Sequence, residues 1–346
     1  MKRILLALFA AVTLTGCDSA ASNQPSFTLA WSEYPSWSVF GVADQKKLID
    51  GAKGKLGPIE EKWQVDIVLR QADYDPCLSM FASNVIDAVC MTNMDALNPA
   101  LGRRSVAILP TSTSVGADAC VTVGIDSVAQ LRGTPVYGLE KSVSEYCFVR
   151  NLELLGEKES DHKFTNMDPA AAATALQTNS AETKAIVVWN PFVMQTLKAK
   201  KDAKVLFDSS TIPEEIIDMV VIGRDALDKP GGDRFAHAVI DAFYQLNAMM
   251  AAPATGDDTL KAIGAKFSDL SLEEMREVVK QTRFYSTPDA AIRLFEGDKL
   301  KETMTNVVAF CVDHGIVDKA PTIDYGMGKS DLTFSGEYIR AVQAKQ

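Results

Sequence analysis

Short apolar runs alternate with segments of helical periodicity through the first two thirds of this chain, and this alternation restricts its fold more than any other feature. The pattern is typical of an α/β protein, in which a mainly parallel sheet is flanked by helices. We expect strands at Phe27–Trp31, Val65–Arg70, Ile86–Met91, Val106–Leu109, Ala119–Gly124, Thr134–Leu139, Ala185–Trp189 and Met219–Gly223. We expect helices between them at Gln45–Lys53, Pro76–Ser83, Asn93–Leu101, Ser144–Leu155, Pro169–Gln177 and Pro191–Lys200.

The pattern changes after Asp225, where successive helices follow without a strong strand candidate. These helices are expected at Arg234–Met250, Asp257–Ala265, Ser271–Gln281, Pro288–Leu294 and Asp298–His314. An α/β start and a helical end suggest one lobe that begins, leaves for a second lobe and returns. We therefore predict that residues 27–112 and 220–346 form lobe 1 and that residues 113–219 form lobe 2. Two crossover segments, near 107–124 and 216–224, would connect the lobes as a hinge.

The N-terminus has the features of an export signal. Lys2 and Arg3 precede a short apolar run that ends in Leu14-Thr15-Gly16-Cys17, a sequence that resembles the bacterial lipobox. We predict a lipoprotein signal peptide at residues 1–16, a lipid on Cys17 and a polar tether at residues 17–26. The protein would then be anchored on the periplasmic side of the envelope. Asp18 resembles an inner-membrane retention signal, and the alternative is a soluble secreted protein cut near residue 20 or 21.

Composition excludes several classes of protein. The net charge of −10 argues against nucleic acid, because a protein that neutralises phosphates needs a basic face. Beyond the N-terminus, no apolar run approaches the roughly 20 residues that span a bilayer. The three histidines lie far apart and no CxxC or P-loop occurs, so we expect no metal site, no cofactor and no catalytic residues. Among Cys77, Cys90, Cys120, Cys147 and Cys311, no spacing identifies disulfide pairs, and buried thiols are an equal alternative.

Polar and aromatic residues follow the expected strands, where open α/β sheets bind their ligands. The polarity of loops in general explains some of these polar residues, but it does not readily explain the aromatic ones. The alternative role for the aromatic residues is packing in the core or between the lobes. The candidate ligand-binding residues are Trp31, Glu33, Tyr34, Trp37, Asp73, Thr92, Asn93, Thr111, Glu140, Ser142, Ser144, Trp189 and Asn190.

Four passages in this order resemble the periplasmic substrate-binding proteins of ABC importers, in the nitrate/sulfonate/taurine and thiamine-precursor group. They are Leu78–Met94, Val115–Gly124 with Ser127–Val136, Leu139–Gly156, and Asn166–Pro191. The helical tail Arg234–Val317 also matches the ending of this family. The resemblance implies a two-lobed type II binding-protein fold, a monomer that is not an enzyme, and partnership with an inner-membrane permease and a separate ATPase. Where the family commonly has Trp-Glu-Pro, this chain has Trp189-Asn190-Pro191.

The local chemistry favours a different ligand from the anions and sulfonates of that group. Ser142 and Glu145 have the spacing of a capping box, in which Glu145 would bond to the backbone of Ser142 and compete for the donors that an anion needs. Carboxylates near aromatic rings suit a nitrogen-rich cation. An anion would need a basic group, and Lys141 is the main candidate for one nearby. We expect a small amine, amidine or pyrimidine-like nutrient, bound by hinge closure. A small anion, a same-fold pyrimidine-synthesis enzyme and a sensory binding module are the alternatives.

Overall fold

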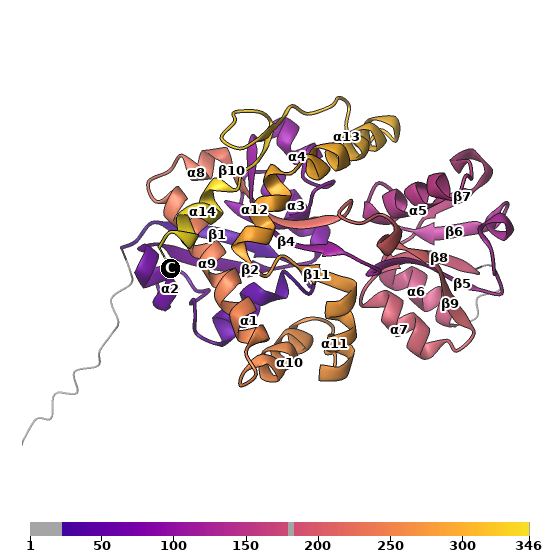
Figure 1. The fold of residues 1–346 in the computed structure, drawn as a ribbon, viewed down its shortest axis with the longest axis horizontal. Coiled ribbons are helices and arrows are strands. Elements are labelled where there is room, and N and C mark those ends of the chain that lie inside the picture. Colours follow the sequence, from indigo (N-terminus) through magenta and orange to yellow (C-terminus); the bar gives the residue numbers. More distant parts are fainter. Residues whose placement is uncertain (1–22, 179–182, 346) are drawn as a thin grey trace, which may run out of the picture.

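The structure, a computed structural model, describes residues 23–178 and 183–345. Two β-sheets flanked by helices form two lobes that lie side by side along the long axis of the molecule (Figure 1). We call the part built on the larger sheet lobe 1 and the part built on the smaller sheet lobe 2. The α/β fold class predicted from the sequence is confirmed. Cys17, the predicted lipidation site, and most of the predicted tether lie outside the described residues.

The sheet of lobe 1 has the strand order β12-β13-β4-β10-β3-β1-β2, and β11 also pairs with β4. Its strands are β1 (Ser26–Trp31), β2 (Asp66–Gln71), β3 (Ala88–Thr92), β4 (Ser105–Ser114), β10 (Ile217–Gly223), β11 (Thr282–Phe284), β12 (Ile323–Tyr325) and β13 (Leu332–Phe334). The pairs β1–β2 and β1–β3 are parallel, so their carboxyl ends meet at one edge of the sheet.

The sheet of lobe 2 has the strand order β7-β6-β8-β5-β9. Its strands are β5 (Asp118–Val123), β6 (Pro135–Gly138), β7 (Lys163–Asn166), β8 (Ala185–Trp189) and β9 (Ala203–Asp208). The β6 strand pairs with β7 and β8 in parallel. Its helices are α5 (Val143–Leu154), α6 (Pro169–Gln177) and α7 (Phe192–Ala199).

Two connections join the lobes, one from β4 to β5 and the other from β9 to β10. The β10 strand runs antiparallel to β3 and β4, and β5 runs antiparallel to β8 and β9. Both sheets are therefore mixed. As a consequence, β5 and β10 begin at the edge where the neighbouring parallel strands end: Asp118 pairs with Trp189, and Asp218 pairs with Thr92.

Helices cover both faces of the sheet in lobe 1 (Figure 1). They are α1 (Ser38–Gln45), α2 (Pro58–Trp63), α3 (Tyr74–Ala82), α4 (Leu97–Gly102), α8 (Arg224–Leu227), α9 (Gly232–Ala251), α10 (Gly256–Lys266), α11 (Leu272–Gln281), α12 (Pro288–Glu296), α13 (Asp298–Asp313) and α14 (Glu337–Gln343). The α9 helix buries most of one face, including Phe235 and Phe243, against the core. Among the described residues, no helix combines the length and apolar character needed to cross a membrane.

Two secondary-structure predictions are wrong. The helix expected at Gln45–Lys53 is instead α1, which begins seven residues earlier at Ser38 and ends before Lys47, a residue in the left-handed region with φ 59°. The segment after Asp225 does contain strands, namely β11, β12 and β13, each of three residues. Strands this short leave too little alternation in the sequence to be distinguished from loops. The strands β7 and β9 also went unpredicted, and they form the two edges of their sheet.

All five cysteines in the described part of the chain are free and buried: Cys77, Cys90, Cys120, Cys147 and Cys311. The structure therefore contains no disulfide among them. Burial raises the pKa of the Cys77 thiol to about 11 and that of Cys311 to about 12. These thiols are protonated at neutral pH and act as small core residues.

Candidate ligand-binding cleft

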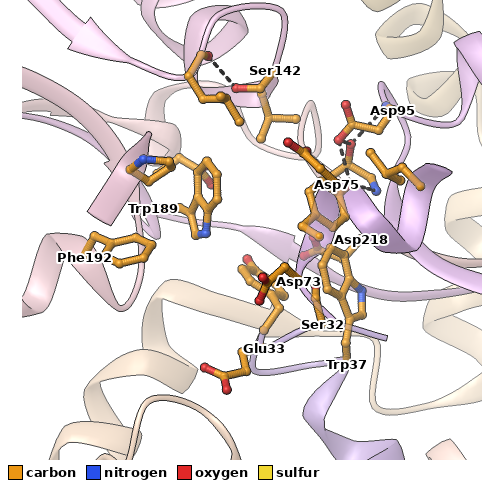
Figure 2. Close-up of a pocket in the computed structure, with 18 of the residues that line it drawn as sticks. Ser32, Glu33, Trp37, Asp73, Asp75, Asp95, Ser142, Trp189, Phe192 and Asp218 are labelled. Atoms are coloured by element: carbon orange, nitrogen blue, oxygen red, sulfur yellow. Dashed lines mark hydrogen bonds between the residues drawn. The ribbon is translucent and has the colours of Figure 1, made fainter. Parts of the chain in front are cut away.

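A cleft of about 690 Å³ lies between the two lobes. Its lobe 1 wall comes from the loops that follow β1, β2 and β3, and its lobe 2 wall comes from those that follow β6, β7 and β8. The starts of β5 and β10 contribute Asp118 and Asp218. Figure 2 shows side chains from both lobes converging on this space. The cleft therefore lies at the edge where ligands of open α/β sheets bind.

Aromatic rings form a stack on the lobe 1 wall. The ring centroids of Trp37 and Tyr74 lie 5.3 Å apart with planes inclined by 19°, and those of Tyr34 and Trp37 lie 4.8 Å apart. Trp189 and Phe192 face them from lobe 2, with ring centroids 6.3 Å from each other (Figure 2). The two walls together offer ring faces to a flat or cationic ligand.

Buried carboxyl groups form the floor of the cleft. Asp218 is 2% exposed and accepts a hydrogen bond of 2.6 Å from the Ser112 hydroxyl. Burial raises the pKa of Asp218 well above its usual range, and the nearby Asp118 carboxyl raises it further. Burial also raises the pKa of Asp118, itself 2% exposed, to about 7. Neither carboxyl has an ion pair in the described structure.

A third carboxyl, that of Asp95, lies beside the aromatic wall. It accepts hydrogen bonds from the Tyr74 hydroxyl at 2.6 Å and from the Thr92 hydroxyl at 2.7 Å. Burial raises the pKa of Asp95 despite these two hydrogen bonds, which act in the opposite direction. The Tyr74 hydroxyl also accepts a 3.0 Å hydrogen bond from the Thr92 backbone N–H, so the network fixes the Tyr74 ring that stacks on Trp37.

The ionisable groups that line the cleft are strongly unbalanced. Among the described residues, Lys141 is the only basic residue that lines it. The lining carboxyl residues are Glu33, Asp73, Asp75, Asp95, Asp118, Glu140, Asp168 and Asp218. The five exposed carboxyl residues among them, Glu33, Asp73, Asp75, Glu140 and Asp168, outnumber Lys141, so the cleft attracts a positively charged ligand and repels an anion.

The start of α5 borders the cleft on the lobe 2 side. Ser142 caps the helix and accepts a 3.2 Å hydrogen bond from the Ser144 N–H. The predicted capping box does not form: the Ser142 hydroxyl accepts from the Ser144 N–H rather than from that of Glu145, and Glu145 accepts its 2.5 Å hydrogen bond from the N–H of Lys141 rather than from Ser142. Lys141 itself lies in the left-handed region, with φ 57°. Glu145 nevertheless occupies a donor that an anion could use, as expected.

The structure brings eight of the thirteen predicted binding residues to the cleft lining: Glu33, Tyr34, Trp37, Asp73, Thr92, Glu140, Ser142 and Trp189. Glu33, Asp73 and Glu140 are exposed at its mouth, whereas Tyr34 and Trp37 are buried in its wall. The other five residues do not line the cleft: Trp31, Asn93, Thr111, Ser144 and Asn190.

These five side chains are buried and serve the framework instead. Trp31 packs under α1, where a Cβ at Gly41 would come within 2.5 Å of its ring. Thr111 shares a 2.9 Å hydrogen bond with Ser36. Ser144 is fully buried within α5. Placement at a strand end settles the position of a residue along the strand but not the direction of its side chain.

Asn93 and Asn190 hold the connection between the lobes. The Asn93 amide donates to the carbonyl of Glu215 at 3.1 Å and accepts from the Ile217 N–H at 3.0 Å, so it pairs with the chain that enters β10. The Asn190 amide donates to the Gln281 side chain at the end of α11 at 2.6 Å. Both residues therefore contact the opposite segment of protein rather than the open cleft.

Several lining residues were not among the predicted ones. The acidic and aromatic ones among them are Asp75, Asp95, Asp118, Asp168, Asp218, Tyr74 and Phe192. The prediction considered only residues after strands, but Asp118 and Asp218 lie at the beginning of strands that run antiparallel to their neighbours. A signal was present in the sequence, because each is a lone carboxylate in an otherwise apolar strand, which is costly to bury without a purpose.

In the described ranges, no three or more His, Cys, Asp or Glu side chains are arranged to hold a metal ion. The acidic residues of the cleft are thus spread around its walls rather than clustered as ligands.

Comparisons with known proteins agree with this architecture. A family model described as the prokaryotic membrane lipoprotein lipid attachment site matches residues 1–17, which confirms the lipoprotein signal predicted there. No curated protein matches the chain by sequence.

Solved structures match nearly the whole chain. The periplasmic aliphatic sulphonate binding protein SsuA from Escherichia coli is 16% identical, with a TM-score of 0.68 over 85% of this chain and 89% of its own. A putative periplasmic sulfonate-binding protein from Methylobacillus flagellatus KT is 13% identical, with a TM-score of 0.70 over 94% and 95%. The Candida albicans CA3427 gene product, described as having the generic periplasmic binding protein fold, is 15% identical, with a TM-score of 0.60 over 86% and 92%. This chain therefore has the periplasmic binding protein fold, as the sequence resemblance implied.

Proposed function

We propose that this protein is the solute-binding lipoprotein of an ABC importer and that its cleft captures a small nitrogen-containing nutrient, an amine, amidine or pyrimidine-like compound. The observation that carries the ligand class is the cleft floor, where the carboxyl groups of Asp118 and Asp218 are 2% exposed and have no basic partner.

The physical argument is one of charge compensation. A carboxylate removed from water is strongly unfavourable unless an opposite charge or several donors accompany it. Among the described residues that line the cleft, eight carry a carboxyl group and Lys141 alone is basic. A cationic ligand would therefore supply the positive charge that these walls lack. The Trp37 and Trp189 rings favour the same ligand, since a cation over an indole face gains about 0.5 to 2 kcal/mol.

Closure of the two lobes would complete the capture. Contacts between the lobes are already present: Lys141, which lines the cleft, donates to the carbonyl of Gly315 at 3.3 Å, and His314 pairs with Glu159 at 2.9 Å. A ligand that touches both walls binds the closed form more tightly and so shifts the equilibrium toward it.

Delivery to a permease follows from the anchor. The lipid attachment signal supports a membrane-anchored protein. We propose that it acts as a monomer at the periplasmic face of the inner membrane, where it would present the closed form to a permease driven by a separate ATPase. Attachment to the same membrane raises the effective concentration of the binding protein at the permease.

A small anion is the second candidate ligand. Two structural neighbours are described as sulfonate-binding proteins, and the start of α5 with Lys141 lines this cleft. Free N–H groups at a helix start favour anions. Against this candidate stand the eight carboxyl residues and the bond from Lys141 N–H to Glu145.

The test is a thermal-shift and calorimetric panel of putrescine, agmatine, benzamidine and cytosine, against taurine, methanesulfonate and nitrate, all at pH 7.5. We expect stabilisation by one or more of the nitrogen compounds and none by the anions. Stabilisation by sulfonates or nitrate alone would refute the ligand class in favour of the second candidate. A panel without any binder would also count against it.

A further inference from the structure

We infer that Asp118 and Asp218 together form the anchoring subsite for the positively charged group of the ligand, and that occupation of this subsite releases a proton to solvent. This inference rests on the proposed function, which it extends from a class of ligand to two named residues and a pH-dependent binding step.

The two carboxyl groups are brought together by the connections between the lobes. Asp118 is the first residue of β5 and Asp218 the second residue of β10, so each marks the point where one crossover enters its sheet. Both line the cleft, and both are 2% exposed. Because the two connections between the lobes carry the subsite, a ligand held there lies beside the hinge about which the lobes would close.

Hydrogen bonds hold both residues in place from behind. The Asp118 N–H donates to the Ser114 hydroxyl at 3.2 Å, and that hydroxyl shares a 2.6 Å hydrogen bond with Ser209 in the other connection. The Asp218 carboxyl accepts from Ser112, whose hydroxyl lies 2.8 Å from that of Ser36. The subsite is therefore preorganised, which favours a specific role in binding.

The titratable groups that face this pair from the surrounding elements are acids or thiols. They are Tyr34 before α1, Cys90 in β3, Asp95 after β3 and Cys147 in α5. Each of these groups is neutral when protonated and negative when ionised, so none of them carries a positive charge. No positive charge from the described protein therefore compensates the pair, and burial raises the pKa of Asp118 to about 7 and that of Asp218 well above its usual range.

The proton balance follows from this arrangement. Without ligand and below about pH 7, Asp118 carries a proton. When an ammonium or amidinium group binds, the Asp118 carboxyl loses its proton to solvent and the resulting carboxylate pairs with the cation. Affinity for a cation then rises with pH, by about tenfold per unit between pH 5 and 6, and levels off above about pH 7.

An anion would produce the opposite dependence. Protonated carboxyl groups can donate hydrogen bonds, so an anion at this subsite would keep or take up protons and bind more tightly at low pH. The sign of the pH dependence therefore separates the two ligand classes at the same two residues.

The experiment is isothermal titration of the full-length lipoprotein in detergent micelles with agmatine, putrescine and benzamidine. Titrations at pH 6.0 and 7.5, in two buffers with different ionisation enthalpies, count the protons released. We expect close to one proton released at pH 6.0 and fewer at pH 7.5. Asp118→Asn should abolish most of the release and weaken binding by about tenfold to a hundredfold, the size of a lost charge-assisted hydrogen bond. Asp318→Asn, an exposed carboxylate outside the cleft, is the matched control and should leave both quantities unchanged.

The outcomes distinguish this inference from the proposed function. If none of the three cations binds, this inference is overturned, while the proposed function still stands if cytosine binds in the panel described above. If a cation binds without proton release, or with proton uptake, the inference is wrong while the proposed function stands. Proton counting on the unaltered protein decides this even if Asp118→Asn does not fold, and Asp218→Asn offers a second variant.

Discussion

The substitution Asp118→Asn should stabilise the ligand-free protein at alkaline pH. Asn preserves the size and shape of the side chain but cannot ionise. Burial raises the pKa of Asp118 from its ordinary value of 3.8 to about 7, a difference of roughly three pKa units. At 1.36 kcal/mol per unit, ionisation in the folded state costs at most about 4 kcal/mol.

The sign follows from proton linkage. The folded state keeps a proton on Asp118 that the unfolded chain loses above pH 3.8, so the free energy of unfolding falls as pH rises from about 4 to 7. Asp118→Asn removes this loss. We expect about 2 to 4 kcal/mol of stabilisation at pH 8; the lower end of this range applies because Asp118 and Asp218 interact and share part of the cost of ionisation. At pH 4 we expect little change.

Urea unfolding followed by circular dichroism, at pH 4 and pH 8, measures the effect from the transition midpoint and slope. The control Asp318→Asn, at an exposed site, should change stability by less than about 0.5 kcal/mol at both pH values. Destabilisation by Asp118→Asn at pH 8, or an effect independent of pH, would refute the argument that this carboxyl is buried without a counter-charge.

Three further predictions concern packing and the contacts between lobes. Gly41→Ala should lower stability by about 1 to 3 kcal/mol, because its Cβ would meet the buried Trp31 ring at 2.5 Å; Gly102→Ala, with open space around it, should be near neutral in the same thermal melts. Arg150→Met should cost about 3 kcal/mol at pH 7 in urea unfolding, since it leaves the buried Glu215 without its ion pair. Burial raises the pKa of Glu215, but hydrogen bonds from Arg150 and Tyr146 lower it overall, so the effect of Arg150→Met should shrink as pH falls below about 4.5; an equal loss at pH 3 would contradict this reasoning. Burial lowers the pKa of His314, but Glu159 and the Phe310 carbonyl raise it overall, so the contact between lobes should stabilise at pH 5.5 and fade as pH rises past 6.5; Glu159→Gln should remove that dependence from the melting temperature.

Much of the fold could be predicted because its signals are local. The bounds of β8 and α6 agree with the predicted segments to the residue. An apolar run bounded by polar residues indicates β8, and Pro169 at the first helical position, with Asp168 accepting from the Ala171 N–H at 3.0 Å, indicates the start of α6. Such patterns depend only on residues near one another in the chain.

Other elements depended on distant partners. Residues Ser38–Gln45 form α1, although their buried positions are nearly continuous and lack a helical period. The three-residue strand β11 exists because it pairs with residues 112–114 of β4, and β13 pairs with residues 105–107 at the other end of the same strand. No local pattern identifies a strand whose stability comes from a neighbour so far along the chain.

The amino-acid sequence by itself determined the two-sheet class, the lipoprotein signal and the aromatic and acidic character of the residues that follow the strands. Only the tertiary structure decided that Trp31 and Asn93 turn into the framework and that Asp118 and Asp218 both line the cleft. The physical reason is the direction of the crossover strands. Because β5 and β10 run antiparallel to their neighbours, their first residues arrive at the edge where the parallel strands end, and that pairing is set by sheet register rather than by local sequence.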